Sequence, residues 1–512
     1  MIVKLVMLLV FFAVMIGVGI YARKHAGNVT DFVLGGRSVG PWLTAFAYGT
    51  SYFSAVVFVG YAGQFGWKYG LASTWIGLGN AILGSLLAWV VLGRRTRIMT
   101  HHLSAATMPD FFGKRFDSNA LRIAASAIVF VFLIPYTASL YNGLSRLFGM
   151  AFDVPYAVCV VLMATLTGVY VILGGYMATA INDFIQGIIM LGGIVAVVLA
   201  VLNGQGGFMQ AVRSLSEIPS DNPLTMGQPG AFASFFGPDP LNLLGVVILT
   251  SLGTWGLPQM VHKFYTIKNE KAVKTGTIIS TFFAVIISGG CYFLGGFGRL
   301  FDNPAIYAQD GSIIYDAIIP EMLSTLPDVL IGIVVILVLS ASMSTLSSLV
   351  LTSSSTLTLD FIKGNLLKDL SDKKQLLLMR VLIVFFIAVS VVLALDPPTF
   401  IAQLMGISWG ALAGAFLAPF LYGLFWKRVT RAAVWASFIA GVGITVLNMF
   451  FHFIESSINA GAAAMVAGLV IVPVVSVLTP KMEKKRVEEI FSCYDEPVSV
   501  KRKIALPEKE EA

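Results

Sequence analysis

Long runs of apolar residues recur along almost the whole chain, and they constrain the fold more than any other feature of the sequence. The stretch IGIVVILVL at residues 331–339, for example, contains no charged residue. About twenty such residues, wound as an α-helix, cross the ~30 Å hydrocarbon core of a bilayer. Charged residues make up only 12% of the 512 residues, about half of the usual share in a soluble domain. Because a membrane β-barrel would show short alternating segments instead, we predict an all-α polytopic membrane protein.

Thirteen apolar segments are long enough to be membrane spans, and we number them as predicted spans 1 to 13. They lie near residues 3–22, 41–65, 73–93, 120–147, 155–173, 179–202, 240–262, 275–298, 327–352, 378–396, 399–425, 431–452 and 460–479. Residues 1–480 are therefore expected to form one membrane domain. Residues 481–512 form a charged tail that has no place in a bilayer.

Positive charges mark alternate loops. Most Lys and Arg residues between the spans follow odd-numbered spans, near residues 23–37, 94–115, 263–274, 363–374 and 427–431, and more lie in the tail. Because cytoplasmic loops are enriched in Lys and Arg, this predicts an outside N-terminus and an inside C-terminus. It also accounts for the net charge of +7 without a nucleic-acid partner. The same reasoning places His262 and Lys263 in solvent at the cytoplasmic interface.

Two predicted spans contain residues that interrupt a helix. Span 2 contains the run Gly49-Thr50-Ser51, and span 7 contains Gly253, Gly256 and Pro258 beside Trp255. These spans are the first members of two five-span sets, spans 2–6 and 7–11, which we expect to be inverted repeats near residues 41–202 and 240–425. Interrupted spans at corresponding positions of two halves indicate the substrate site of a secondary transporter.

Hydroxyl groups and one carboxylate lie inside other spans. Span 9 carries Ser344, Thr345, Ser347 and Ser348 within five positions, more hydroxyls than bonding back to the same helix requires. Neutral oxygens suit a weakly held alkali cation such as sodium. Hydroxyls of span 9 and carbonyls of span 2 would form one sodium site. Asp183 in span 6, with Ser347 and Ser348, would form a second, unless Asp183 lies solvated at the cytoplasmic interface.

Three motifs point to a known family. The motifs are DFVLGGRS followed by GP before span 2, ILGG followed by ND in spans 5 and 6, and MSTLSS in span 9. In this order and spacing the chain resembles the sodium:solute symporters, whose bacterial members carry proline, pantothenate, sugars or sialic acid. The resemblance implies thirteen spans, an outside N-terminus, a plasma-membrane location and sodium as the coupling ion.

The resemblance also implies roles for particular residues. The conserved sodium site corresponds to Thr50, Phe53, Ala341, Ser344 and Thr345, and a second site in some members corresponds to Asp183, Ser347 and Ser348. The substrate would contact Tyr52, Tyr136, Trp255, Pro258 and Gln259. Proline carriers have an aspartate at the position of Tyr52. Pantothenate-type members have a tyrosine there, but they lack the match to Tyr136.

These observations predict a sodium-coupled importer of a small organic solute that works by alternating access. The solute would be an amino acid such as proline or a carboxylate such as pantothenate. Since no Lys or Arg is expected at the depth of the interrupted spans, backbone N–H groups, helix N-termini or sodium would hold a carboxylate. The alternatives are a sugar or sialic acid symporter and a proton-coupled carrier with Asp183 as the relay. A channel or sensor is the rival of another class, and a fused sensor is not favoured because the polar tail is short and resembles no kinase or receiver domain. A membrane enzyme is not favoured because the sequence has no paired carboxylates, metal-spaced histidines or nucleophile elbow. The oligomeric state is left open.

Overall fold

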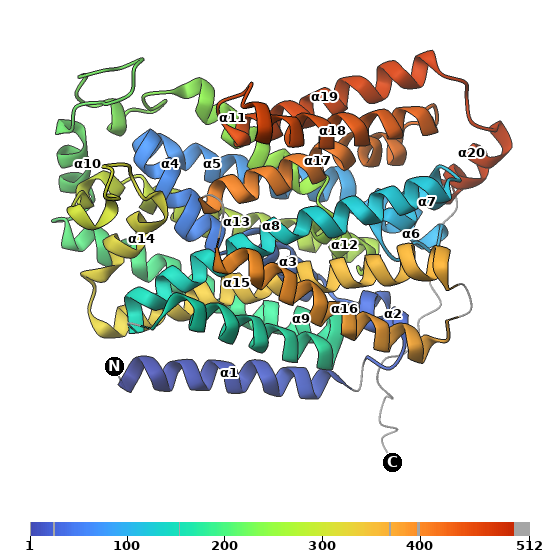
Figure 1. Cartoon of the computed structure of the whole chain (residues 1–512), viewed down its shortest axis with the longest axis horizontal. Coiled ribbons are helices and arrows are strands. Elements are labelled where there is room, and N and C mark those ends of the chain that lie inside the picture. The colour runs from blue at the N-terminus through green and yellow to red at the C-terminus, as the bar shows by residue number, and fades with distance from the viewer. Residues whose placement is uncertain (1, 24–25, 153, 368–369, 397–399, 496–512) are drawn as a thin grey trace.

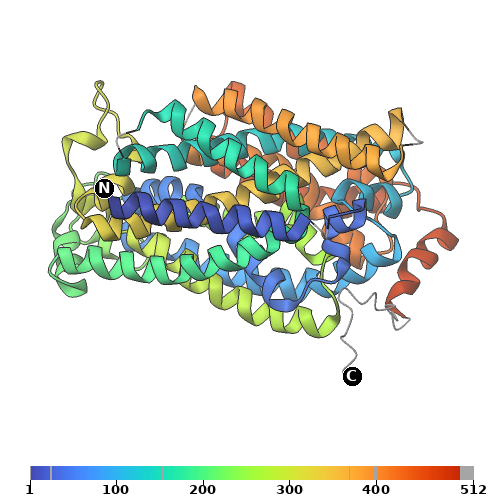
Figure 2. The same ribbon diagram turned by 90° about the horizontal axis from the view of Figure 1, so that it is seen from below.

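The computed structural model describes residues 2–23, 26–152, 154–367, 370–396 and 400–495. All the secondary-structure elements longer than an isolated bridge in these ranges are helices. The long helices run mostly along one direction of the molecule, as two perpendicular views show (Figures 1 and 2). The predicted all-α class is therefore correct.

The longest helices form the body of the bundle. They are α1 (Ile2–Ala22), α8 (Asn119–Phe152), α9 (Tyr156–Gly204), α13 (Glu270–Gly295), α15 (Asp328–Thr356), α16 (Asp372–Leu395), α17 (Ile401–Phe425), α18 (Arg431–Phe451) and α19 (Ser457–Leu478). Helix α15 packs against α8, α9, α1 and α3. Nearly every side chain from Ser340 to Thr356 is buried, so the hydroxyl-rich half of this helix lies inside the protein.

Shorter helices complete the bundle and its ends. They are α2 (Val29–Leu34), α3 (Pro41–Tyr52), α4 (Ala62–Tyr69), α5 (Thr74–Gly79), α6 (Arg94–His102), α7 (Met108–Arg115), α10 (Phe208–Glu217), α11 (Pro240–Leu252), α12 (Pro258–Tyr265), α14 (Tyr315–Ser324) and α20 (Lys484–Phe491). Wider, π-helical turns continue several helices, at Val56–Tyr61, Asn80–Leu87, Trp89–Gly93 and Leu357–Leu366. A proline occupies the first turn of α3, α11 and α12, where its missing N–H costs nothing.

Eleven helical stretches of the described chain are long and apolar enough to cross a membrane, against thirteen predicted. Two of the eleven, Val56–His102 and Tyr156–Gly204, contain 47 and 49 residues, about twice the length that a bilayer requires. The first covers the end of predicted span 2 and all of span 3, and the second covers spans 5 and 6. The second is broken at Gly175, whose φ of 53° and ψ of −144° suit glycine alone. The number thirteen stays a prediction.

The connecting segments gather at two opposite ends of the bundle. Helix α1 begins at the end that carries α10 and α14, whereas α6, α7 and α20 lie at the other end (Figure 1). The start of α1 and the basic segments thus lie at opposite ends of the bundle, as an outside N-terminus and basic cytoplasmic loops require. Which end faces the cytoplasm stays a prediction. Residues 24–25 and 368–369 of the basic loops and residues 496–512 of the tail lie outside the described residues.

Helix α13 crosses α4 and α5 with the backbones in direct contact. A Cβ atom on Gly66 of α4 would lie 2.0 Å from the carbonyl oxygen of Gly295, and one on Gly77 of α5 would lie 2.8 Å from the Cα of Gly289. Small residues allow membrane helices to approach this closely. No larger side chain fits at these two crossings without moving a helix.

The buried carboxylate of Asp316 gives a prediction about stability and pH. Asp316 lies in α14, its Oδ2 accepts a hydrogen bond from the backbone N–H of Ile401 at 3.3 Å, and burial raises its pKa to about 6 although Arg146 opposes this shift. Because the folded pKa exceeds the ordinary value of 3.8, the stability linked to the bound proton is present below pH 4 and is lost as the pH rises through 6.

Asp316→Asn should therefore stabilise the protein by up to about 3 kcal/mol at pH 7.5 and by only about 1 kcal/mol at pH 4.5, since the amide is neutral and still accepts the Ile401 N–H. Thermal unfolding of the detergent-solubilised protein at both pH values measures this. Asp310→Asn, at a fully exposed position, is the control. An equal gain at both pH values would contradict the prediction.

Candidate functional site

Helix α3 is interrupted at the position that the sequence predicts. It ends at Tyr52, Phe53 has an extended backbone with φ −107° and ψ 103°, and helical structure resumes within three residues. The interruption frees backbone carbonyls of the last turn from the usual helical pattern. The carbonyl oxygens of Thr50 and Ser51 instead accept from Thr345 Oγ1, at 3.2 and 3.4 Å. The broken helix and α15 are thus joined through main-chain oxygens.

Five residues of α3, the break after it and α15 form an oxygen-rich contact, which we call the oxygen cluster; its members are Thr50, Phe53, Ala341, Ser344 and Thr345. Ser344 Oγ donates to Thr50 Oγ1 at 2.7 Å. Thr345 Oγ1 also lies 3.1 Å from the carbonyl oxygen of Ala341. Phe53 and Ala341 line the same small gap, and all five residues are buried.

The donor set of the oxygen cluster suits one kind of ion. Its oxygens are hydroxyls and carbonyls, which are hard, neutral ligands typical of alkali-cation sites. In the described part of the chain, no three His, Cys, Asp or Glu side chains are grouped in a way that could hold a metal ion. The residues therefore fit a sodium ion, and the cluster brings together all five positions expected for the first sodium site.

A second polar group lies one helical turn further along α15 and centres on an ion pair. Lys263 Nζ lies 3.6 Å from Asp183 Oδ2 and donates to Ser348 Oγ at 2.9 Å. Ser348 Oγ also lies 2.9 Å from Ser51 Oγ in α3. Ser347 Oγ points elsewhere and donates to the carbonyl oxygen of Ser344 in its own helix, at 2.8 Å. Of the three residues expected at a second sodium site, Asp183 and Ser348 therefore face Lys263, and Ser347 bonds back to its own helix.

Two sequence-based expectations about this region are wrong. Lys263 is only 2% exposed and His262 only 7%, so neither is solvated at an interface, and a lysine does lie beside the interrupted helices. The reason is the start of α12 at Pro258, which turns this segment inward against α3, α6 and α15. Asp183 is fully buried and is not a solvated interfacial carboxylate either.

Aromatic side chains surround the break in α3. The ring of Tyr52 stacks on Phe53 with centroids 4.2 Å apart and lies 6.2 Å from the ring of Trp409 in α17. The ring of Tyr136 in α8 also contacts Trp409, with centroids 5.9 Å apart and the rings nearly perpendicular. The Tyr52 hydroxyl donates to the carbonyl oxygen of Thr250, 2.5 Å away. The structure thus brings Tyr52 and Tyr136 together through Trp409, a residue that the sequence analysis did not select.

The interruption predicted in span 7 is also present. Helix α11 ends at Leu252, one tight turn follows at Gly253–Trp255, and α12 begins at Pro258. Trp255 Nε1 donates to the carbonyl oxygen of Leu83 at 2.9 Å. Gln259 is buried, neither atom of its amide has a hydrogen-bond partner among the described residues, and it lines a narrow gap with Lys263 and Ser348. Gln259 therefore lies beside the ion pair, whereas Trp255 faces the segment that contains Leu83.

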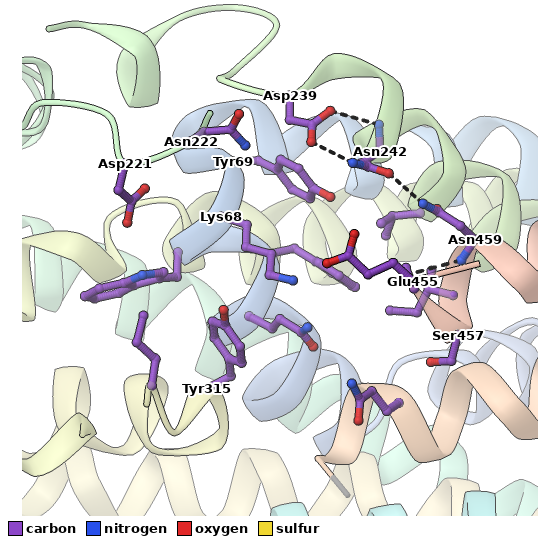
Figure 3. A pocket seen from close by; sticks show the side chains of 18 of the residues that line it. Lys68, Tyr69, Asp221, Asn222, Asp239, Asn242, Tyr315, Glu455, Ser457 and Asn459 are labelled. Atoms are coloured by element: carbon purple, nitrogen blue, oxygen red, sulfur yellow. Dashed lines mark hydrogen bonds between the residues drawn. The ribbon is translucent and has the colours of Figure 1, made fainter. Parts of the chain in front are cut away.

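A polar pocket of about 590 Å³ opens among α4, α11, α14, α17 and α19. Figure 3 shows Lys68 of α4 and Glu455 pointing into the same space, with Tyr315 and Asp239 on its sides. The Lys68 ammonium lies 5.3 Å from the ring centre of Tyr315. The gap beside Phe53 and Ala341 has room for only about 10 Å³. The polar pocket can therefore admit a small solute, whereas the gap beside Phe53 and Ala341 cannot.

Comparison with known proteins places these features in context. The model of the sodium:solute symporter family matches residues 32–441, which is most of the chain. A sodium/proline symporter of Staphylococcus aureus (strain JH9) is 29% identical over 496 residues, which cover 94% of this chain and 93% of that protein. The solved structure of a Na+-coupled sialic acid symporter, bound to substrate in an outward-open state, aligns over 94% of this chain and 98% of that one, with 17% identity and a TM-score of 0.76. That structural likeness shows a shared fold.

Proposed function

Because the chain belongs to the sodium:solute symporter family, we propose that it imports one small organic solute by alternating access, driven by the inward movement of sodium. The chain is a multi-pass protein of the plasma membrane, and sodium is its coupling ion. The proposed topology has thirteen spans with the N-terminus outside. The proposed membrane domain is residues 1–480, with core repeats near 41–202 and 240–425, followed by the polar tail 481–512.

The observation that carries this proposal is the oxygen cluster between two helices of different halves. Thr50 belongs to α3, Phe53 to the break that follows it, and Ala341, Ser344 and Thr345 belong to α15. A sodium ion held there would take the place of the hydroxyl hydrogen bonds that now join the helices, and it would fix the distance between α3 and α15. Coupling between two binding sites is reciprocal. Sodium that orders the break in α3 would therefore tighten solute binding beside Tyr52, and solute would tighten sodium binding.

The aromatic group beside the break supports an amino acid or another small carboxylate as the solute. The Tyr136 hydroxyl and Trp409 Nε1 are buried polar groups that lie close to each other, with Ser54 beside the hydroxyl, and neither makes a hydrogen bond of good geometry within the described residues. A carboxylate oxygen would satisfy both, because an unpaired buried donor is costly. The rings of Tyr52 and Trp409 would cover the apolar part of the solute. Trp255, Pro258 and Gln259 would line the side formed by the break between α11 and α12.

Proline and pantothenate are the two leading candidates. The S. aureus relative is a sodium/proline symporter, and this chain retains a tyrosine at position 136. Tyr52, in place of the aspartate of proline carriers, favours a pantothenate-type carboxylate. A sugar or sialic acid symporter is the alternative within the family. A proton-coupled carrier is the alternative in mechanism, because Asp183 is buried and lies next to α3.

Uptake into proteoliposomes tests the proposed function. Purified protein is reconstituted and offered proline, pantothenate, short monocarboxylates, sialic acid and glucose, with an inward sodium gradient or with choline replacing sodium at constant pH. We expect one solute to accumulate above its external concentration with sodium, and no accumulation with choline. Empty liposomes are the control. If the solute accumulates equally well in choline, and a proton gradient drives that accumulation, the carrier is coupled to protons and not to sodium.

A further inference from the structure

We propose that the Lys263 ammonium permanently fills the second cation site of this protein. This inference rests on the proposed function, since it concerns how many sodium ions that function uses. The amine of the chain takes the position between Asp183 and Ser348 that a second sodium would otherwise hold. The protein then binds one sodium per cycle, at the oxygen cluster alone.

The geometry around Lys263 is that of a coordinated cation. An ammonium has three N–H donors and no acceptor, and three groups face it. Ser348 Oγ accepts at 2.9 Å, Asp183 Oδ2 lies at 3.6 Å, and the face of the Tyr176 ring has its centre 5.3 Å away. Lys263 is 2% exposed and Asp183 is fully buried. The pair is therefore enclosed by protein and not screened by solvent.

The charge of this region leaves no role for another cation. Asp183 and Lys263 carry opposite charges and together contribute none. A sodium ion placed on Ser348 and Asp183 would lie within a few ångströms of the ammonium, in a buried region where like charges repel strongly. Ser348 Oγ is also already shared between Lys263 and Ser51, at 2.9 Å each.

The third expected ligand also fails to face the second site. Ser347 Oγ donates to the carbonyl oxygen of Ser344, one turn back on its own helix, which is the usual behaviour of a serine in an apolar helix. The contrast with Ser344 and Thr345 is direct, because both of these reach α3. Two neighbouring hydroxyl pairs of one helix therefore have different roles: one pair can serve sodium, and the other is occupied by lysine or by the helix itself.

Equilibrium binding of ²²Na+ to the purified full-length protein tests this inference without knowledge of the solute. We expect one sodium per chain in the wild type, and the same single ion bound about 10-fold or more weakly in Thr345→Ala, because its only site loses one ligand. Lys263→Met removes the charge and keeps most of the volume, so the unpaired Asp183 should recruit sodium. This variant should bind two sodium ions per chain. Adding Asp183→Asn to it should return the number to one.

Matched variants make each outcome decisive. Lys268→Met changes an exposed lysine five residues along and should leave one sodium per chain, and Lys263→Arg should do the same because it keeps the charge. Two sodium ions in the wild type, or one in a folded Lys263→Met, would overturn the inference and leave sodium coupling intact. One sodium retained at wild-type affinity by Thr345→Ala would also overturn it, even if Lys263→Met does not fold. No sodium binding by the wild type would contradict the proposed function itself.

Discussion

Asp183→Asn should lower the free energy of unfolding by about 3–5 kcal/mol, the usual cost of removing one partner from a buried ion pair. The substitution keeps the shape of the side chain and removes its charge, so it leaves Lys263 as an uncompensated cation that is 2% exposed. Unfolding of the detergent-solubilised protein by increasing amounts of SDS, followed by tryptophan fluorescence, measures this loss.

The double variant Asp183→Asn/Lys263→Met separates the ion pair from packing. Replacing both members of a buried pair by neutral groups of similar volume is often neutral or stabilising, so the double variant should regain most of the stability that Asp183→Asn loses. Lys268→Met serves again as the exposed control. If the single and double variants are equally unstable, then the Asp183 carboxylate contributes through shape or hydrogen bonding, and the ion pair is not a main contributor.

Thr345→Ala should raise the sodium concentration needed for half-maximal uptake by about 10-fold or more. Thr345 Oγ1 lies between the carbonyl oxygens of Thr50 and Ala341, so its loss removes one oxygen from the proposed sodium site and weakens the link between α3 and α15. A hydrogen bond or ligand contact to a charged group contributes about 1.5–3 kcal/mol, which corresponds to roughly 10- to 100-fold in affinity.

Two control variants test whether the effect of Thr345→Ala comes from the loss of its oxygen. Thr345→Ser keeps the oxygen and should stay within a few-fold of the wild type. Thr165→Ala removes an exposed threonine of α9 whose hydroxyl bonds back to Val161 in its own helix, and it should change nothing in the sodium dependence. Sodium dependence that is unchanged in Thr345→Ala would place the coupling ion somewhere other than the oxygen cluster.

Local sequence patterns predicted the parts of the fold that depend on local chemistry. Clusters of glycine and proline weaken a helix, so the breaks at residues 53–55 and 253–257 could be located without a structure, whereas the single prolines Pro135, Pro419 and Pro473 lie inside continuous helices. The run of hydroxyls at Ser344–Ser348 could likewise be assigned to a polar contact inside the protein, because so many hydroxyls in one membrane helix need partners. The fold class could be predicted from the length of the apolar segments, because about twenty apolar residues wound as a helix cross a bilayer.

Long-range pairing could not be predicted in this way. Lys263 follows an apolar segment and precedes other basic residues, so its neighbours in sequence suggest a membrane boundary, and only the fold shows that Asp183, eighty positions earlier, faces it. The one available signal was Asp183 itself, since a carboxylate inside a membrane helix requires a partner. Trp409 was missed because a tryptophan in an apolar helix usually contacts lipid or core side chains. The number of spans differs because two pairs of predicted spans, 2 with 3 and 5 with 6, lie within single continuous helical stretches of the structure.

The glycine crossings on α13 have a mechanical consequence for the transport cycle. Helices whose backbones touch, as α4 does at Gly66 and α5 at Gly77, have no flexible side chains between them that could deform when one helix slides past the other. Any displacement along such a crossing would press peptide groups together. We therefore expect the three helices to move as one unit during transport, with the flexible joints at the two interrupted helices that border the oxygen cluster and the buried lysine.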